Sequence, residues 1–343
     1  MISFSCDYLE GAHPKILERL AATNLKQTEG YGEDPHCDAA RALICQKIAC
    51  PDADVHFLTG GTQTNMTFLA HALKPWQAVL SADSGHIATH ETGAVEATGH
   101  KIYTIAADRG KLTPALLVEA LSHHTDHHAV APRVVYISNA TEIGTVFTRR
   151  ELSALRDFCK AHGLYLYMDG ARLASALTAE GNDLHFEDLP KYCDAFYLGG
   201  TKCGALFGEA LVIVHPELKQ DFNYSLKQRG GLLAKGRLLG LQFEALFEDD
   251  LYLTLGRHAN AACTKLRAAF EKAGFSFMVD SPTNQIFPIL PNALIAKLRE
   301  KYSFRDWEAV DADHTAVRFV TSWATTNAMT DAFAQDLEAL LHD

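Results

Sequence analysis

Two segments decide the fold class of this chain: GLYLYMDGAR, residues 163–172, and AFYLGGTK, residues 195–202. Each is a run of aromatic and aliphatic residues that stops close to glycine, and such runs are typical of strands buried on both faces of a parallel sheet. Ligands of these sheets bind outside the carboxyl ends of the strands. We therefore expect Asp169 and Lys202, which follow the two runs, to project into one crevice.

Strand and helix signals alternate on either side of these segments. Further strands are expected at residues 55–58, 78–80, 101–105, 134–138 and 210–214. Helices are expected from about residue 15, from residue 35, after residue 61, from about residue 90, and at 114–122, 149–162, 217–226 and 232–247. This alternation predicts an α/β fold in which helices cover both faces of a mostly parallel sheet.

The pattern changes after residue 250. A long helix is expected at 251–272, and short strands at 276–279, 285–289 and 317–320 then alternate with helices near Ala293 and Asp331. Because 343 residues exceed the usual limit for one hydrophobic core, we expect more than one domain. The predicted parts are an N-terminal segment at 1–14, a large domain at 15–250 and a smaller α+β domain at 251–343.

The composition is that of a globular protein, and it narrows the range of partners. Apolar residues make up 48% of the chain and charged residues 21%. The net charge of −11 argues against nucleic acids and anionic membranes, which need basic surfaces. No uncharged apolar run reaches the roughly 18 residues of a membrane span, and no secretion signal is recognised. The eight cysteines include no CxxC pair, so we expect reduced thiols and a cytoplasmic location.

An aspartate and a lysine at the ends of two expected parallel strands point to pyridoxal 5'-phosphate (PLP) as a cofactor. Asp169 can hold the pyridinium nitrogen, and Lys202 can form a Schiff base with the aldehyde. The turn TGGT at 59–62, between a strand and a helix, offers backbone N–H groups that suit a phosphate. Taken singly, these residues could equally be a helix cap, a surface lysine and a tight turn. Their joint placement at strand ends favours the cofactor site.

Two groups of histidines are open to more than one interpretation. His86, in SGHI at 84–87, could stack on a planar cofactor ring or be an ordinary hydrogen-bonded histidine. Residues 123–128 contain four histidines, but these lie in a polar connection without fixed spacing to other ligands. We expect a solvated loop there and no metal site.

With these motifs on one chain, the sequence resembles the threonine aldolase family, the PLP-dependent aldolases of 3-hydroxy amino acids, and especially its low-specificity L-threonine aldolase and phenylserine aldolase branch. The segments that carry the resemblance are YGEDP at 31, GGTQTN at 60, SGHIATHETGA at 84, NATEIGTVFT at 139, MDGARLASAL at 168, GGTKCGALFGEAL at 199, KQRGGLLAKGR at 227 and VRFVTSWATT at 317. The resemblance implies the aspartate-aminotransferase-like fold (fold type I), a PLP-dependent transferase-like large domain with a mostly parallel seven-stranded sheet.

The resemblance also implies a role for each matching residue. Lys202 matches the lysine that holds the cofactor covalently, and it is grouped with His86 and Glu142 as the residues of the reaction. The residues implied in cofactor binding are Gly61, Thr62, His86, Asp169, Arg172, Lys202 and Lys227. The residues implied in substrate binding are Cys6, Tyr31, Arg172 and Arg318, with Tyr31 contributed by the neighbouring subunit.

The chain departs from the family pattern at three positions. Cys6 stands where many members have a serine, and a thiol is a weak hydrogen-bond partner for a substrate carboxylate. Glu142 stands near the place of a histidine in well-studied members, and Gly60 replaces a serine or threonine near the phosphate. The base for the β-hydroxyl proton is left open between His86 and Glu142.

The activity implied by the resemblance is cleavage of L-3-hydroxy-amino acids, such as L-threonine, L-allo-threonine and phenylserine, to glycine and an aldehyde. The expected assembly is a homodimer or homotetramer with active sites at the interface. Because a fold does not fix a reaction, β-elimination, transamination and PLP binding without turnover are alternatives. A metal-dependent enzyme that uses the histidines at 123–128 is the weakest alternative.

Overall fold

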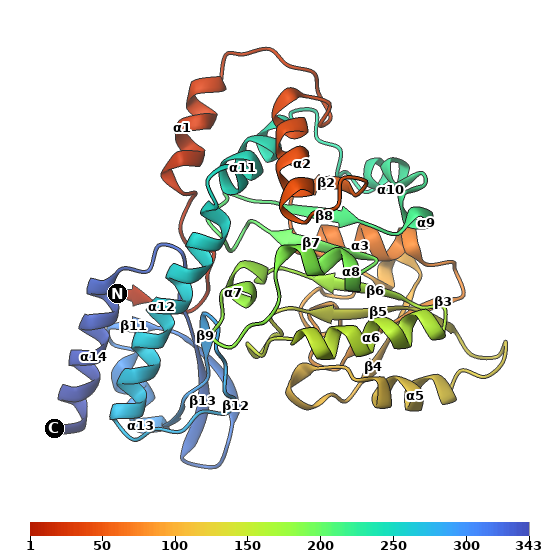
Figure 1. Ribbon diagram of the computed structural model, residues 1–343. Coiled ribbons are helices and arrows are strands. Elements are labelled where there is room, and N and C mark those ends of the chain that lie inside the picture. Colours follow the sequence, from red (N-terminus) through yellow and green to blue (C-terminus); the bar gives the residue numbers. More distant parts are fainter. Residues whose placement is uncertain (343) are drawn as a thin grey trace.

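A seven-stranded sheet forms the centre of the computed structural model, which describes residues 1–342 (Figure 1). In spatial order its strands are β2 (Asp54–Leu58), β8 (Glu209–Ile213), β7 (Ala195–Gly199), β6 (Tyr165–Asp169), β5 (Ala131–Ser138), β3 (Gln77–Ala82) and β4 (Lys101–Ile105). Strand β8 is antiparallel to both of its neighbours, and the remaining pairs are parallel. The predicted α/β class and the mostly parallel sheet are confirmed.

The strands at the middle of this sheet are buried on both faces, as their apolar runs predict. Alternate residues of β6 enter different cores: Leu166 and Met168 join one hydrophobic cluster, and Tyr165 and Tyr167 join the other. Helices α2, α5, α6 and α11 contribute to the first cluster, and α3 and α10 contribute to the second. Because both faces are covered, these strands have no polar side to alternate with the apolar one.

The helices have the following bounds in chain order. They are α1 (Pro14–Thr23), α2 (Pro35–Lys47), α3 (Gly61–Ala72), α4 (His86–Thr89), α5 (Pro114–Ser122), α6 (Arg149–Ala161), α7 (Leu173–Leu177), α8 (Leu189–Tyr192), α9 (Pro216–Lys219), α10 (Phe222–Gln228), α11 (Arg237–Glu248), α12 (Leu251–Lys272), α13 (Asn292–Leu298) and α14 (Asn327–His342). Short 3-10 turns lie at Glu96–Thr98, Asp108–Gly110 and Phe186–Asp188.

The C-terminal part forms a second, smaller sheet around β13 (His314–Val320). Strands β10 (Ile289–Pro291) and β12 (Arg305–Ala309) flank β13 in antiparallel orientation, and β9 (Gln285–Ile286) pairs with its end. The N-terminal β1 (Ile2–Ser3) pairs in parallel with β11 (Tyr302–Ser303).

The two ends of the chain share one core, in which Phe4 packs with Phe319 and Phe333. Helix α12 joins this core to that of the large sheet, because Leu255 belongs to the sheet's cluster and Phe270 to the C-terminal one. The division of the chain at residues 14 and 250 stays a prediction.

Three predicted elements are interrupted, each for a local reason. The helix expected from about residue 90 is the short α4, which ends before His90, because Thr92 and Gly93 adopt left-handed backbone angles. The helix expected at 217–226 is divided into α9 and α10 at Asp221, whose φ is 58°. The strand expected at 285–289 is split at Pro288, which has no N–H to donate.

Two further predictions miss their boundaries. The strand expected at 276–279 is reduced to a single bridge between Phe277 and Pro288. The helix expected from residue 232 begins at Arg237, because Gly230 and Gly231 open a turn that extends to Gly236.

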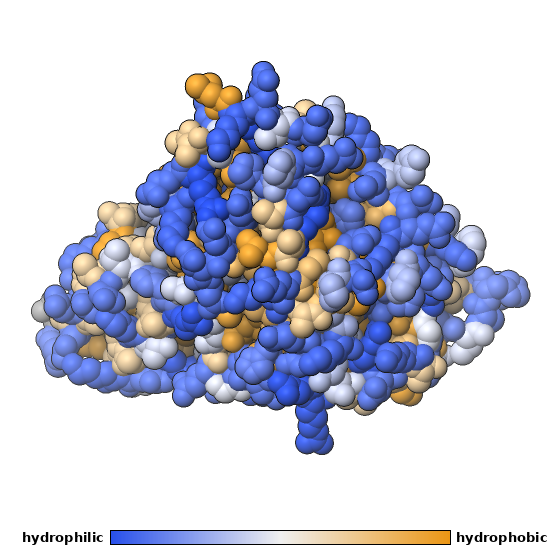
Figure 2. Space-filling view, turned by 45° about the horizontal axis from the view of Figure 1, so that its top comes forward, coloured by the Kyte–Doolittle hydropathy of each residue, from blue (hydrophilic) through white to orange (hydrophobic). Residues whose placement is uncertain are grey.

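In the face shown in Figure 2, apolar side chains gather in small areas between larger hydrophilic ones. Over residues 1–342, none of the helices combines the length and the apolar character needed to cross a membrane.

We predict that Gly256→Ala lowers stability, although alanine normally favours a helix by about 1 kcal/mol. Helix α12 crosses α7 at Gly256, where an added Cβ would lie 2.6 Å from the carbonyl carbon of Ala174. Because backbone cannot yield as a side chain can, we expect a loss of about 1–3 kcal/mol, measured by urea unfolding. Gly11→Ala is the control, since a Cβ there meets no atom within 4 Å. Equal stability of the two variants would contradict the prediction.

Candidate functional site

A cavity of about 620 Å³ opens at the carboxyl ends of the central strands. Its walls come from the segments that follow β2, β3, β5, β6 and β7, together with β12 and β13. Eight of the residues singled out from the sequence line it: Gly61, Thr62, His86, Glu142, Asp169, Arg172, Lys202 and Arg318. Asp169 and Lys202 therefore share one cavity, as expected from their places at strand ends.

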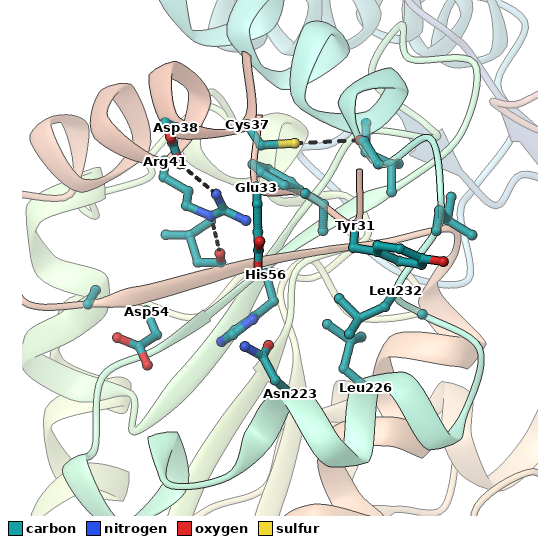
Figure 3. A pocket seen from close by; sticks show the side chains of 18 residues that line it. Tyr31, Glu33, Cys37, Asp38, Arg41, Asp54, His56, Asn223, Leu226 and Leu232 are labelled. Atoms are coloured by element: carbon teal, nitrogen blue, oxygen red, sulfur yellow. Dashed lines mark hydrogen bonds and ion pairs between the residues drawn. The ribbon is translucent and has the colours of Figure 1, made fainter. Parts of the chain in front are cut away.

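Three of the singled-out residues lie elsewhere. Cys6 is buried beside Asp7 and is not among the residues that line this cavity. Tyr31 lines a second cavity of about 480 Å³, and Figure 3 shows it next to Leu232. Lys227 lies beside Tyr31, and its Nζ is 4.5 Å from the centre of the Tyr31 ring.

The carboxylate of Asp169 is buried and fully hydrogen-bonded at the end of β6. Its Oδ1 accepts from the Tyr197 hydroxyl at 2.5 Å and from the backbone N–H of Ala171 at 3.0 Å. Its Oδ2 accepts from the Tyr136 hydroxyl at 2.7 Å and from the Asn65 amide at 3.0 Å. Burial alone would raise its pKa, but His86 and these side-chain donors outweigh burial and hold the pKa of Asp169 below its usual value.

A buried carboxylate, Glu91, links His86 to this network. Glu91 Oε1 contacts Nδ1 of His86 at 2.8 Å and accepts a hydrogen bond from Asn65 at 2.8 Å. Burial would lower the pKa of His86, but the hydrogen bond to Glu91 and the charge of Asp169 raise it above its usual value. The contact fixes the orientation of the imidazole, which lines the cavity.

Glu142 is the second acidic group in the cavity wall. Its Oε1 accepts from the Ser138 hydroxyl at 2.8 Å and from the backbone N–H of His86 at 3.0 Å. Burial, followed by the negative charge of Asp169, raises the pKa of Glu142. A carboxyl group with a raised pKa is a better proton acceptor at neutral pH than an ordinary one.

Lys202 lies beside a buried acid that the sequence analysis did not single out. Burial, followed by the charge of Arg172, lowers the pKa of Lys202, which favours the neutral amine. Glu209, on β8, accepts hydrogen bonds from Gly200 N–H at 3.1 Å and from the Thr201 hydroxyl at 3.0 Å. Burial raises the pKa of Glu209 to about 8.

The two arginines of the cavity differ in their partners. Arg172 donates from Nε and Nη2 to the two oxygens of Asp7, at 2.7 and 3.0 Å, so its charge is paired. Arg318 donates from Nη2 to the Ser5 carbonyl at 3.4 Å, and its buried Nε has no partner among the described residues. Burial, together with the charge of Arg172, lowers the pKa of Arg318 to about 10.

Several residues of this site escape sequence reasoning, and some leave a signal. Tyr136, Tyr167 and Tyr197 each stand two residues before the end of a buried strand, where a hydroxyl needs a partner. The Tyr167 hydroxyl donates to Asn65 at 2.9 Å. Asp7 carries no such signal, because its partner Arg172 is 165 residues away. The further lining residues Tyr8, Arg305, Asp306 and Trp307 likewise follow no motif, and His90 lies in the SGHIATHETGA segment without a role of its own.

The residues of the cavity fit the predicted cofactor. Its volume is within the range of small-ligand sites, and the start of α3 offers free backbone N–H groups with open space around a Cβ at Gly60. Asp169 is a buried acceptor for a ring N–H, although its acceptor sites are filled by four donors. Of the two tyrosines that donate to Asp169, Tyr197 is the one that also lines the cavity. Its hydroxyl is therefore the donor that a bound ring N–H would replace.

The histidines at 123–128 lie between α5 and β5, away from this cavity. Within residues 1–342, no group of three or more potential metal ligands is found.

Comparisons with known proteins agree with this geometry. A family model described as beta-eliminating lyase matches residues 4–293. The low specificity L-threonine aldolase of Pseudomonas sp. (strain NCIMB 10558) is 32% identical over 98% of this chain and 97% of its own length. The solved threonine aldolase of Leishmania major is 47% identical with a TM-score of 0.98, over 99% of both chains.

A more distant solved structure defines the fold alone. A Thermus thermophilus aspartate aminotransferase variant, 14% identical, has a TM-score of 0.72 over 99% of this chain and 91% of its own. The predicted aspartate-aminotransferase-like fold is confirmed.

We predict that Tyr197→Phe destabilises the cofactor-free protein in a pH-dependent way. Loss of a hydrogen bond to a buried carboxylate costs about 1.5–3 kcal/mol. The folded-state pKa of Asp169 lies below its unfolded value of 3.8, so its favourable interactions are present above that value and are lost as the pH falls. The cost should therefore be full from neutral pH down to about pH 4 and should shrink as the pH falls further, as measured by urea unfolding between about pH 2.5 and 8.

Tyr167→Phe is the matched control for this prediction. Its hydroxyl donates within the same buried network, but to the neutral amide of Asn65. We expect a loss of about 1 kcal/mol that does not vary with pH. Identical pH profiles for the two variants would disprove the role given to the Asp169 charge.

Proposed function

Since this chain belongs to the family of threonine aldolases and beta-eliminating lyases, we propose that it is a PLP-dependent carbon–carbon lyase. Its substrates are L-3-hydroxy-amino acids of the threonine type, including L-threonine, L-allo-threonine and phenylserine, and its products are glycine and an aldehyde. The observation that carries this proposal is the placement of Asp169 and Lys202 in one cavity beside the start of α3.

The residues that would hold the cofactor surround this cavity. The lowered pKa of Lys202 suits an amine that attaches to an aldehyde, and Asp169 would accept the hydrogen of the ring nitrogen. The first N–H groups of α3, with Thr62, would hold the phosphate, and the oriented imidazole of His86 would lie against the ring. When bound, PLP supplies a sink for the electron pair left at Cα as the bond to Cβ breaks.

Arg318 is the group that would bind the substrate carboxylate. Its guanidinium has a free buried N–H, whereas Arg172 already donates two hydrogen bonds to Asp7. Arg172 would therefore contact the substrate carboxylate mainly through the N–H groups that do not donate to Asp7. An Arg–carboxylate contact fixes the rotation about the bond from nitrogen to Cα, and this selects which bond at Cα is broken.

Glu142 is our proposed base for the β-hydroxyl proton. One of its oxygens is held by two hydrogen bonds, and the residue lines the cavity with a raised pKa. His86 is the weaker candidate, because the raised pKa of its imidazole favours the protonated form, which cannot accept a proton.

The assembly and the cell compartment are further parts of the proposal. A homodimer or homotetramer is supported by Tyr31, which is 49% exposed and does not line the cavity of Lys202 in its own chain. From there it would reach the active site of a neighbouring subunit, beside Lys227. A cytoplasmic location is supported by the cysteines, all eight of which are free thiols.

We predict that Lys202→Ala abolishes both cleavage and covalent attachment of PLP. Glycine release should be measured from L-threonine, L-allo-threonine and phenylserine, beside the absorbance spectrum of the protein with PLP. Lys101→Ala, at an exposed position on the edge strand β4, is the control and should retain both properties. An unchanged cofactor spectrum in Lys202→Ala would remove Lys202 from its role. Products other than glycine from the parent protein would instead indicate elimination or transamination.

We predict that Glu142→Gln lowers kcat for cleavage of L-threonine by about 10²–10⁴-fold, the usual contribution of a general base. His86→Phe keeps a flat ring but removes the ring nitrogens, so its loss of kcat should be smaller. The measurement is kcat from pH 6 to 9 for both variants, with the PLP content of each determined beforehand. A larger loss in His86→Phe than in Glu142→Gln would reverse the assignment.

A further inference from the structure

Two arginines lie side by side in the wall of the active-site cavity. Arg305 on β12 is directly opposite Arg318 on β13, so both side chains project from the same face of the small sheet. The register of this pair shifts between Asp306 and Glu308, which places Trp307 in a β-bulge. The Trp307 ring then lies 5.3 Å from the Arg318 guanidinium, and both arginines line the cavity with it.

Neither guanidinium has a carboxylate partner within residues 1–342. Arg318 has only the Ser5 carbonyl, and its buried Nε is unpaired. Arg305 is exposed, and its guanidinium makes no hydrogen bond or ion pair with the described residues. Like charges directly opposite each other in an antiparallel pair are unfavourable, so an anion bound beside both guanidinium groups would stabilise this arrangement.

The other groups around the pair do not supply that anion. His90 adds a second ring, and burial together with the charges of His86, Arg318 and Arg305 lowers its pKa. Tyr8 contributes a phenol. Asp306 is the acidic residue of β12 that lines the cavity, but its Oδ1 accepts from Arg299 at 2.6 Å, so its charge is already paired.

A substrate with one carboxylate leaves one of these arginines unmatched. The proposed function gives the α-carboxylate to Arg318, and Arg172 is already paired with Asp7. Opposed side chains of an antiparallel pair leave the sheet with Cβ atoms about 4.5–5.5 Å apart. Adjacent guanidinium groups of this kind match two carboxylates that are joined only through Cα and Cβ.

On this basis, and resting on the proposed aldolase function, we propose that the cavity accepts 3-hydroxy amino acids with a second carboxylate on Cβ, and that Arg305 binds that carboxylate. The simplest such substrate is L-3-hydroxyaspartate. Breaking its Cα–Cβ bond, with loss of the hydroxyl proton to the base and gain of a proton at Cα, gives glyoxylate and glycine. Atoms and electrons balance without an oxidant or a reductant.

The first test compares kcat/KM for both Cβ epimers of L-3-hydroxyaspartate with kcat/KM for L-threonine in the PLP-loaded enzyme. The parent enzyme should release glyoxylate, and Arg305→Gln should lower the ratio of hydroxyaspartate to threonine about tenfold, as expected for a charge-assisted contact at an exposed site. Arg305→Lys should restore part of the ratio. Arg150→Gln is the control, because Arg150 is exposed on α6 and carries the same charge.

Two results of this test would overturn the proposal. Unchanged kcat/KM values for both substrates in Arg305→Gln would show that Arg305 does not contact the β-substituent. A parallel loss for both substrates would place Arg305 at the α-carboxylate, which every substrate has, and would likewise leave the ratio unchanged.

A binding test separates this proposal from the proposed function. L-aspartate and L-2-aminobutyrate lack the hydroxyl that cleavage requires, and they differ in the charge of the β-substituent. The dissociation constant of L-aspartate should rise about tenfold in Arg305→Gln relative to that of L-2-aminobutyrate, with a smaller change at high salt. If threonine is not cleaved but this difference is found, the reaction has been misassigned and the second anion site stands. If threonine is cleaved and the difference is absent, the second anion site is wrong.

Discussion

The hydrogen-bonded carboxylate of Asp169 is the interaction on which the site depends. A charged carboxylate in a protein interior is unfavourable unless donors surround it, and here two tyrosine hydroxyls, an amide and a backbone N–H do so. The tyrosines come from β5 and β7, the strands on either side of β6. Strands β5, β6 and β7 must therefore be paired, with α3 packed against them, before all four donors surround the charge of Asp169.

The same network orients the imidazole. Asn65 on α3 donates to both Asp169 and Glu91, and Glu91 in turn contacts His86. The helix whose first turn would hold a phosphate thus also positions, one turn later, the amide that joins the two carboxylates. A shift of α3 would disturb the phosphate end and the ring end of the site together.

Sequence reasoning recovers what depends on local pattern and misses what depends on distant pairing. Apolar runs that end close to glycine predict the strands that are buried on both faces. They also predict that Asp169 and Lys202 converge at the carboxyl ends of those strands. The partner of Arg172 does not follow, because Asp7 reaches it from the N-terminal segment, which packs against the C-terminal sheet. Glu209 is missed for a similar reason: its side chain lies beside Lys202 because β8 is antiparallel to β7, and strand direction cannot be read from an apolar run. The bulge at Trp307 also leaves no signal in the sequence.

Comparison of the charged groups explains which ligand charges the site is built to accept. Burial lowers the pKa of Lys202 and raises that of Glu209 to about 8, so both groups tend toward their neutral forms. Arg172 and Asp7 neutralise each other. Within residues 1–342, the charges without a direct ion-pair partner include the negative Asp169, whose oxygens accept from neutral donors, and, on the small sheet, the positive pair Arg318 and Arg305. A ring nitrogen that carries a proton satisfies the first, and a substrate carboxylate satisfies the second. Because each of these places is complementary to only one sign of charge, a bound amino acid is oriented before any bond is broken, which is the condition for selective cleavage at Cα.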